Sequence, residues 1–383
     1  MEKRNRKKIL FMIDSLTGGG AERILSYILH YLDRSKFDIS LFLVIKEGVY
    51  LKDVPTDIPV SGIFGDVKRI RSPFLRLFYR LYRRTCLELF KIFPAFLSFR
   101  SGIKSHYNIG VSFCEGHNMP LLLLKSNYFK KTIAWIHVDL RTHRCPLGIS
   151  RVGYYASKAD RVFFVSNDAF TGFKELFPGC QNEQNMQVVY NPIDAKEILK
   201  QAELSPEIPK DKFTVLSIGR LTRQKRFDKL IRVHKLLLDR GIDHNVWILG
   251  EGEDCSNLDN QIRDLGVSET CKLLGFQNPY VYLKNADMFV MTSDYEGLPV
   301  VVCESMVLAK PIVSTRVTGP KELLEDGKYG LLVDNNEKAI ENGLEEMILH
   351  SELREKYINK LKENRNNFIF PEDLSSITNL LME

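Results

Sequence analysis

Short apolar runs alternate with amphipathic segments along most of the chain, and the whole pattern occurs twice. Runs such as residues 9–13 and 214–219 are rich in Ile, Leu and Val, which is typical of parallel strands buried on both faces. Segments such as 22–32 and 228–239 have the apolar spacing of helices. Because strand–helix alternation produces doubly wound parallel sheets, two copies of the pattern predict two α/β domains.

The expected strands can be assigned by residue range. They cover 9–13, 39–44, 109–113, 132–137, 161–166 and 187–190 in the first copy, and 214–219, 245–250, 272–276, 288–292, 311–314 and 330–333 in the second. The stretch 191–212 contains three prolines and is interpreted as a linker. Since ligands of doubly wound domains bind at the carboxyl ends of the strands, functional residues are expected in the strand-to-helix loops.

Composition excludes several classes of protein. The 383 residues suffice for about two domains, and 44% hydrophobic with 27% charged residues is ordinary for a globular chain. The seven cysteines include no CxxC pair, which argues against a zinc ribbon or disulfide framework and fits a reducing cytosol. No apolar run approaches the ~18 residues of a membrane helix, and Ile9–Ile13 is too short for a signal peptide.

Charge is divided unequally between the two halves of the chain. Residues 1–180 carry 29 Lys and Arg against 15 Asp and Glu, and residues 181–383 carry 25 against 33. The net charges of +14 and −8 add to the overall +6. The basic first half predicts an anionic partner, such as a membrane surface, a nucleic acid or a phosphorylated substrate.

Much of the positive charge lies in a basic segment, residues 67–104. Between 68 and 104 there are ten basic residues and one acid, interleaved with aromatic residues and leucines. Arg76, Arg80, Arg83 and Arg84 recur at helical spacing, which predicts a basic amphipathic helix on an anionic membrane interface. Packing of this helix on its own domain is the alternative. No nucleic-acid-binding motif accompanies the charge, so no nucleic acid partner is expected.

Three strand-to-helix loops carry residues suited to a phosphorylated ligand. Gly18, Gly19 and Gly20 open a helix after the first strand, where an anion can approach the backbone closely, although a structural turn would use glycines too. The loop after 214–219 holds Arg220 and Lys225, which could clamp a diphosphate without a metal or form a solvated basic loop.

The third loop joins two glutamates eight residues apart. Pro299 is expected at the first position of a helix, so that Glu296 precedes the helix and Glu304 lies inside it. The amides of Gly297 and Leu298 would point out of the helix end toward phosphates while the two acids bind hydroxyl groups. The segment between the acids is apolar, which favours a buried functional Glu304 over a surface acid.

Two further loops of the first half contain candidate acceptor contacts. Glu115 and His117 follow the strand 109–113, and His137 ends the strand 132–137. The loop after His137 carries four charged or titratable residues: Asp139, Arg141, His143 and Arg144. From the residues alone, a structural role is at least as compatible with Glu115 and His117, and a core or capping role is favoured for His137.

The motifs in their order resemble glycosyltransferase family 4, a family of retaining, metal-independent, nucleotide-sugar-dependent enzymes with the GT-B fold. The resemblance is carried by GGGAER, WIHVD, VFFVSND and VYNPID in the first half, and by SIGRLTRQKRFDKLI, ILGEGED, LLGF and MTSDYEGLPVVVCESMVLAKPIVST in the second. It covers nearly all of the second half. It implies two Rossmann-like domains facing a central cleft.

The resemblance also implies roles for individual residues. Arg220 and Lys225 would bind the donor diphosphate, Glu304 the ribose hydroxyls, and Glu296 and His137 would face the donor sugar, which makes all but Glu304 candidate catalytic residues. The remaining implied contacts to the nucleotide sugar are Gly19, Gly20, Gly219, Gly250, Gly252, Gly275, Phe276, Gly297 and Leu298. No cofactor and no metal are implied, and the chain contains no Asp-x-Asp motif of the metal-using alternative.

The implied organisation is an acceptor-binding domain at 1–193, a nucleotide-sugar domain at 194–365 and a C-terminal helix, 366–383, that returns to the first domain. The expected function is retaining transfer of a sugar, from a UDP-sugar by preference, to a lipid-linked glycan in cell-surface polysaccharide biosynthesis. The expected location is the cytoplasm, at the inner face of the membrane. The alternatives are a GT-B relative with other chemistry, such as an epimerase or a glycogen-synthase-like enzyme, and a catalytically silent glycan-binding partner.

Overall fold

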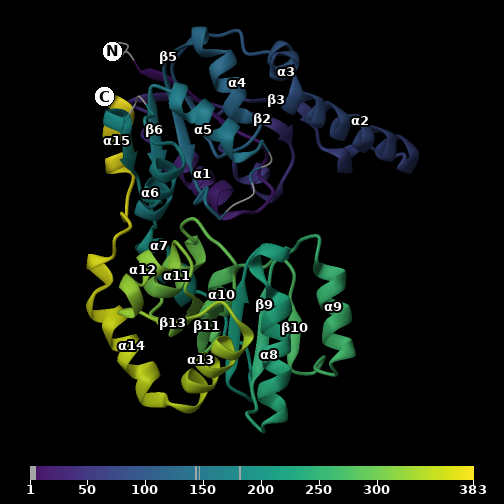
Figure 1. Cartoon of the computed structure of the whole chain (residues 1–383), viewed down its shortest axis with the longest axis vertical. Coiled ribbons are helices and arrows are strands. Elements are labelled where there is room, and N and C mark those ends of the chain that lie inside the picture. Colours follow the sequence, from purple (N-terminus) through teal and green to yellow (C-terminus); the bar gives the residue numbers. More distant parts are fainter. Residues whose placement is uncertain (1–5, 143–144, 146, 181–182) are drawn as a thin grey trace. The chain divides into compact units, whose positions relative to one another are not determined.

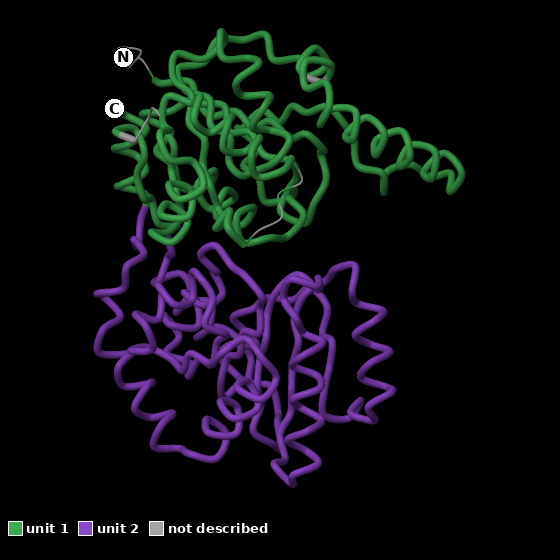
Figure 2. Tube along the Cα trace, in the orientation of Figure 1, with its two compact units in different colours: residues 1–190, 374–383 green, residues 191–373 purple. Residues whose placement is uncertain are grey.

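The structure, a computed structural model, describes residues 6–142, 145, 147–180 and 183–383, and it divides the chain into two compact units (Figures 1 and 2). The first unit contains the chain up to Tyr190 together with Leu374–Glu383, and the second contains Asn191–Asp373. Each unit is built on one parallel sheet with helices packed against it.

The first unit has seven parallel strands in the order β3-β2-β1-β4-β5-β6-β7. Their bounds are β1 (Lys7–Ile13), β2 (Phe37–Lys46), β3 (Val60–Gly65), β4 (Tyr107–Phe113), β5 (Phe129–Ile136), β6 (Arg161–Phe164) and β7 (Met186–Val188). Its helices are α1 (Gly20–Tyr31), α2 (Pro73–Ile92), α3 (Pro94–Arg100), α4 (Asn118–Leu124), α5 (Ile149–Lys158), α6 (Asn167–Leu176) and the C-terminal α15 (Ser375–Met382).

The second unit has six parallel strands in the order β10-β9-β8-β11-β12-β13. They are β8 (Thr214–Ile218), β9 (Asn245–Leu249), β10 (Cys271–Leu273), β11 (Met288–Met291), β12 (Ile312–Thr315) and β13 (Leu331–Val333). The helices are α7 (Ala195–Glu203), α8 (Phe227–Asp239), α9 (Cys255–Asp264), α10 (Pro279–Asn285), α11 (Val300–Val307), α12 (Pro320–Leu323), α13 (Glu337–Leu349) and α14 (Ser351–Glu363).

The continuous apolar runs form the central strands because both faces of each sheet are covered. Residues 9–13 of β1 and 288–291 of β11 are buried without alternation. All twelve strand segments expected from the sequence are present, and the doubly wound α/β architecture is confirmed. One strand, β3, was not predicted from the sequence. It is a half-exposed edge strand with two glycines, so it lacks a continuous apolar run.

Two local predictions were wrong. The expected linker 191–212 contains α7, whose N-cap Asp194 accepts a hydrogen bond from the Glu197 amide and whose apolar face buries Ile198 and Ala202. Prolines on either side therefore delimit a helix.

The second correction concerns Pro299, which was expected at the first position of a helix. It is the N-cap of α11 and lies one position before the first helical residue, Val300.

Each sheet has one place where the strand order reverses direction. The chain leaves β1 for β2 on one side, and β4 lies on the other side of β1. In the second unit, β8 and β11 are related in the same way. Because helices on the two sides diverge there, the loops after these strands border a crevice in which ligands of such sheets bind.

Candidate active site

In the second unit, the reversal point brings together a lysine and a glutamate that lie 71 residues apart in sequence. The loop after β8 carries Lys225 and the loop after β11 carries Glu296, and Lys225 Nζ lies 2.6 Å from Glu296 Oε1. Both side chains are largely buried, with exposed fractions of 18% and 7%. The pair therefore places a fixed cation beside a carboxylate at the edge where a ligand would bind.

Four glycines bring the neighbouring loops of this edge into contact. A Cβ on Gly250 would lie 1.9 Å from the carbonyl oxygen of Gly219, and one on Gly252 would lie 2.1 Å from that of Leu221. The Gly250 amide donates to the Gly275 carbonyl at 2.8 Å. No side chain fits at Gly250 or Gly252, so these residues allow the loops after β8, β9 and β10 to form one continuous backbone surface.

The second glutamate, Glu304, lies within α11 and is 2% exposed. Tyr280 Oη donates to Glu304 Oε1 at 3.3 Å. The backbone at Glu296 is held by the Thr318 hydroxyl, which donates to the Glu296 carbonyl at 2.9 Å. Phe276, in the loop after β10, is 44% exposed, and its contact with a base stays a prediction. Gly297 and Leu298 lie between the two acids, both buried, immediately before the helix.

In the first unit, Glu115 and His137 lie at the carboxyl ends of the adjacent strands β4 and β5. Glu115 Oε1 accepts hydrogen bonds from the amides of His137 and Val138, the latter at 3.1 Å. Burial of the carboxyl raises the pKa of Glu115 to about 7. Burial also lowers the pKa of His137 to about 3, so its imidazole is neutral. Its Nε2 atom has no hydrogen-bond partner among the described residues.

Glu115→Gln should remove a pH dependence of stability. The folded-state pKa of Glu115 lies above its ordinary value of 4.5, so its stabilising contribution is present below pH 4.5 and is lost as pH rises through 7. The wild type should therefore lose about 2–3 kcal/mol of unfolding free energy relative to Glu115→Gln between pH 5 and pH 8. Urea unfolding of both proteins at the two pH values measures this difference, and parallel pH profiles would contradict the prediction.

A further pair at this edge, Asp14 and His117, includes a residue that was not predicted from the sequence. Asp14 Oδ2 lies 2.9 Å from His117 Nδ1, and its two oxygens accept the amides of His117 and Asn118. His117 stacks on Phe90 of α2, with ring centroids 5.6 Å apart. Asp14 directly follows a buried strand, and this position in the sequence could have identified it as a site residue. The pair joins the loop after β1 to the loop after β4.

The other candidate residues of the first unit lie in the loop after His137 and in the glycine loop before α1. Arg141 forms ion pairs with Asp139 at 2.7 Å and Glu175 at 2.9 Å, and these partners raise its pKa. His143 and Arg144 lie outside the described residues. Gly19 is the N-cap of α1 and Gly18 has a φ of 111°, so the loop presents the start of a helix, as expected of an anion-binding turn. Contact of any of these residues with an acceptor or donor stays a prediction.

The part of the chain that the structure describes has neither a metal-site cluster nor a membrane-spanning helix. No cluster of three or more His, Cys, Asp or Glu side chains in that part of the chain has the arrangement of a metal site. Among the helices that the structure describes, none combines the length and the apolar character needed to cross a bilayer.

The chain is similar to known glycosyltransferases in both units. Residues 200–364 match the family model described as glycosyl transferases group 1. The chain is 29% identical over 374 residues to an N-acetylgalactosamine-N,N'-diacetylbacillosaminyl-diphospho-undecaprenol 4-alpha-N-acetylgalactosaminyltransferase of Campylobacter jejuni, which covers 93% of this chain and 94% of that protein. These matches support a glycosyltransferase. The amylovoran biosynthesis glycosyltransferase AmsD of Erwinia amylovora is 25% identical, with the same coverage.

Solved glycosyltransferase structures share the fold. TarM of S. aureus superposes with a TM-score of 0.71 at 14% identity, covering 98% of this chain and 100% of that chain. HepE of Anabaena, in complex with UDP and glucose, superposes with a TM-score of 0.68 at 18% identity, covering 98% of each chain. Both units therefore adopt the Rossmann-like architecture of the GT-B fold. The Lys225–Glu296 pair lies within the stretch that matches the family model.

Proposed function

We propose that the chain transfers a sugar, with retention of configuration and without a metal, from a nucleotide sugar to a lipid-linked glycan acceptor. The observation that carries the proposal is the Lys225–Glu296 pair at the reversal point of the second sheet, inside the region that matches the family. The name of the C. jejuni relative specifies a diphospho-undecaprenol-linked acceptor. UDP is the favoured nucleotide because TarM and HepE structures contain it.

The chemistry follows from where charge develops. The bond between the anomeric carbon and the diphosphate oxygen breaks, and its electron pair stays on the diphosphate. The largely buried Lys225 and the exposed Arg220 would stabilise that charge, since preorganised cations contribute most where charge appears. Glu304 would hold the ribose hydroxyls, while Glu296 and neutral His137 would contact the donor sugar. No metal is required if the two cations perform this task.

Retention is proposed through attack from the face that the diphosphate leaves. The acceptor oxygen forms the new bond to the anomeric carbon, and its proton passes to an oxygen of the departing phosphate. The name of the C. jejuni relative specifies an α-linked product, which requires retention if the donor is α-linked. The anomeric configuration of the product, measured by NMR from an α-linked donor, tests this step, and a β-linked product would overturn it.

Attachment to the membrane is proposed through α2 and α3. Of the α2 residues, only Cys86 and Phe90 are buried in the core of the first unit, with Tyr82 and Leu87 partly buried against it. Most of the other large apolar side chains of α2 are exposed. The large apolar side chains exposed on this surface are Phe74, Leu75, Leu77, Phe78, Leu81, Leu89, Ile92, Phe93, Phe96 and Phe99. Arg80 and Arg84 are exposed among them. Apolar side chains between exposed arginines are complementary to an anionic bilayer interface.

The same helix is anchored on loops of the ligand-binding edge. Arg83 forms an ion pair of 2.7 Å with Glu47, whose carbonyl accepts the amide of Leu16 in the loop that carries Gly18–Gly20. Phe90 stacks on His117 in the loop after β4. A surface that binds lipid would therefore be connected to the edge that is proposed to bind the acceptor. The residues proposed for that contact are Glu115, His117, Asp139 and Arg141.

Thermal unfolding in the presence of nucleotides tests the donor site. The protein is melted with UDP, GDP, ADP, NAD and the corresponding sugars, without metal. A ligand that binds only the native state at 100 times its Kd adds about 2.7 kcal/mol of stability, so one nucleoside diphosphate should raise the melting temperature. Arg220→Ala and Glu304→Ala should abolish the shift, and Arg263→Ala, an exposed arginine of α9, should keep it.

The outcomes separate this proposal from its alternatives. No shift with any nucleotide would contradict it and favour a silent glycan-binding partner. A nucleotide-induced shift without sugar transfer to any acceptor, accompanied by turnover of the nucleotide sugar alone, would favour an epimerase-like relative.

A further inference from the structure

We infer that Asp294 is a positioning residue that fixes the loop carrying Lys225, so that the lysine ammonium is in place before a diphosphate binds. The inference rests on the proposed function. Asp294 does not contact Lys225 directly, and it lies on the loop after β11, two residues before Glu296. Its effect passes through the residue that follows Lys225.

That residue, Arg226, adopts an unusual backbone conformation. Its φ of 52° and ψ of 38° place it in the left-handed region, which residues other than glycine rarely occupy, and it is the N-cap of α8. A conformation of this kind persists only where surrounding contacts hold it. The Arg226 guanidinium is held from two sides, by Asp228 at 3.0 Å and by Asp294 at 3.1 Å.

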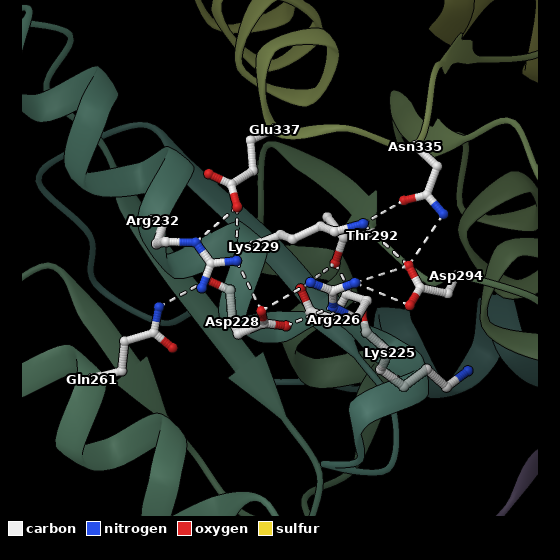
Figure 3. Close-up of polar contacts among 10 residues, drawn as sticks. All are labelled: Lys225, Arg226, Asp228, Lys229, Arg232, Gln261, Thr292, Asp294, Asn335 and Glu337. Atoms are coloured by element: carbon white, nitrogen blue, oxygen red, sulfur yellow. Dashed lines mark hydrogen bonds and ion pairs between the residues drawn. The ribbon is translucent and has the colours of Figure 1, made fainter.

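Asp294 is the centre of a network that spans three loops of the second unit (Figure 3). Besides Arg226, its carboxylate accepts hydrogen bonds from Lys229 at 3.1 Å and from Asn335 at 3.2 Å. Its own amide donates to the Gln224 carbonyl at 2.9 Å, and Gln224 Nε2 donates to the Tyr295 carbonyl at 2.8 Å. The loops after β8 and β11 are therefore joined by side-chain and backbone contacts on both sides of Lys225.

Thr292, at the end of β11, completes the arrangement. Its hydroxyl lies within hydrogen-bond distance of two carbonyls, those of Lys225 at 3.0 Å and Arg226 at 3.2 Å. The Lys225 side chain extends away from the Arg226–Asp294 cluster (Figure 3). Its ammonium donates a hydrogen bond to Glu296 Oε1 at 2.6 Å. The cluster thus fixes the backbone on both sides of Lys225. The Lys225 ammonium stays at the ligand-binding edge.

The expected contribution is preorganisation of charge. A cation whose backbone is already fixed loses little freedom when a diphosphate binds, so more of its interaction energy is available for binding and leaving-group stabilisation. A merely structural role of Asp294 would affect all ligands of the unit equally. A positioning role should affect the diphosphate and spare ligands that do not reach Lys225.

The test compares a diphosphate with its monophosphate in a double-mutant cycle. Affinities for UDP and UMP, and for GDP and GMP, are measured by calorimetry in wild type, Asp294→Asn, Lys225→Met and the double variant. Asp294→Asn should weaken diphosphate binding about 5–30-fold and change monophosphate binding less than about 2-fold. In the Lys225→Met background, Asp294→Asn should cause no further loss, because its effect passes through Lys225.

Control variants keep the inference falsifiable. Glu337→Gln alters the edge of the same network, where Glu337 pairs with Arg232 at 2.7 Å, and should leave diphosphate affinity unchanged. If Asp294→Asn does not fold, Thr292→Val removes the hydroxyl contacts and should give the same selective loss. Equal losses for diphosphate and monophosphate, or an undiminished effect in Lys225→Met, would overturn the inference while leaving the proposed function intact. A wild type that binds no diphosphate would overturn both.

Discussion

Lys225→Met should slow sugar transfer by about 100–1,000-fold, the effect of removing one preorganised charge-stabilising group from an active site. The reason is that the departing diphosphate would lose a cation that the structure holds in an ion pair with Glu296 at 2.6 Å. The variant should also be less stable, because Glu296 is 7% exposed and would remain buried without its partner.

The rate constant for transfer at saturating donor, measured with a radiolabelled nucleotide sugar, checks this prediction. Urea unfolding of each variant shows whether the loss of activity reflects unfolding. Lys356→Met, at an exposed position of α14, is the matched control and should transfer at the wild-type rate. A folded Lys225→Met protein that retains transfer within about threefold of wild type would exclude Lys225 from charge stabilisation.

Phe78→Glu with Leu81→Glu should lower binding to anionic vesicles by at least about 100-fold. Both side chains are exposed on α2, at 64% and 56%. Burial of each one in the membrane would contribute about 1.5–3 kcal/mol to the free energy of binding. Placing carboxylates there also repels the anionic surface. The structure refines the choice of arginines, since Arg76 donates to the Ile70 carbonyl and Arg83 pairs with Glu47, whereas Arg80 and Arg84 are exposed.

Flotation with vesicles of phosphatidylglycerol and phosphatidylcholine measures the loss. Leu349→Glu is the matched control, because Leu349 lies in the second unit and is 56% exposed like Leu81. Arg80→Gln with Arg84→Gln should reduce binding to anionic vesicles by about tenfold or more, with a weaker effect at high salt. Unchanged flotation of both double variants would contradict membrane attachment through α2.

Much of the fold was accessible from local sequence, since buried parallel strands need continuous apolar runs and these are visible without a structure. The strand β3 was missed because an edge strand is covered on fewer sides and tolerates Ser and Gly. The helix α7 was missed because its flanking prolines were interpreted as breaking structure, although Asp194 and the spacing of Ile198 and Ala202 are helical signals.

The sequence alone determined that this chain forms two doubly wound units with glycines, cations and acids in the loops after their strands, because these depend on local spacing. Which of those loops meet depends on how the strands are ordered in each folded sheet. The order of strands joins Lys225 to Glu296 and Asp14 to His117 across 71 and 103 residues, and it brings Asp294 to Arg226, the residue after Lys225. Such pairs depend on long-range packing, for which neighbouring residues carry no periodic signal.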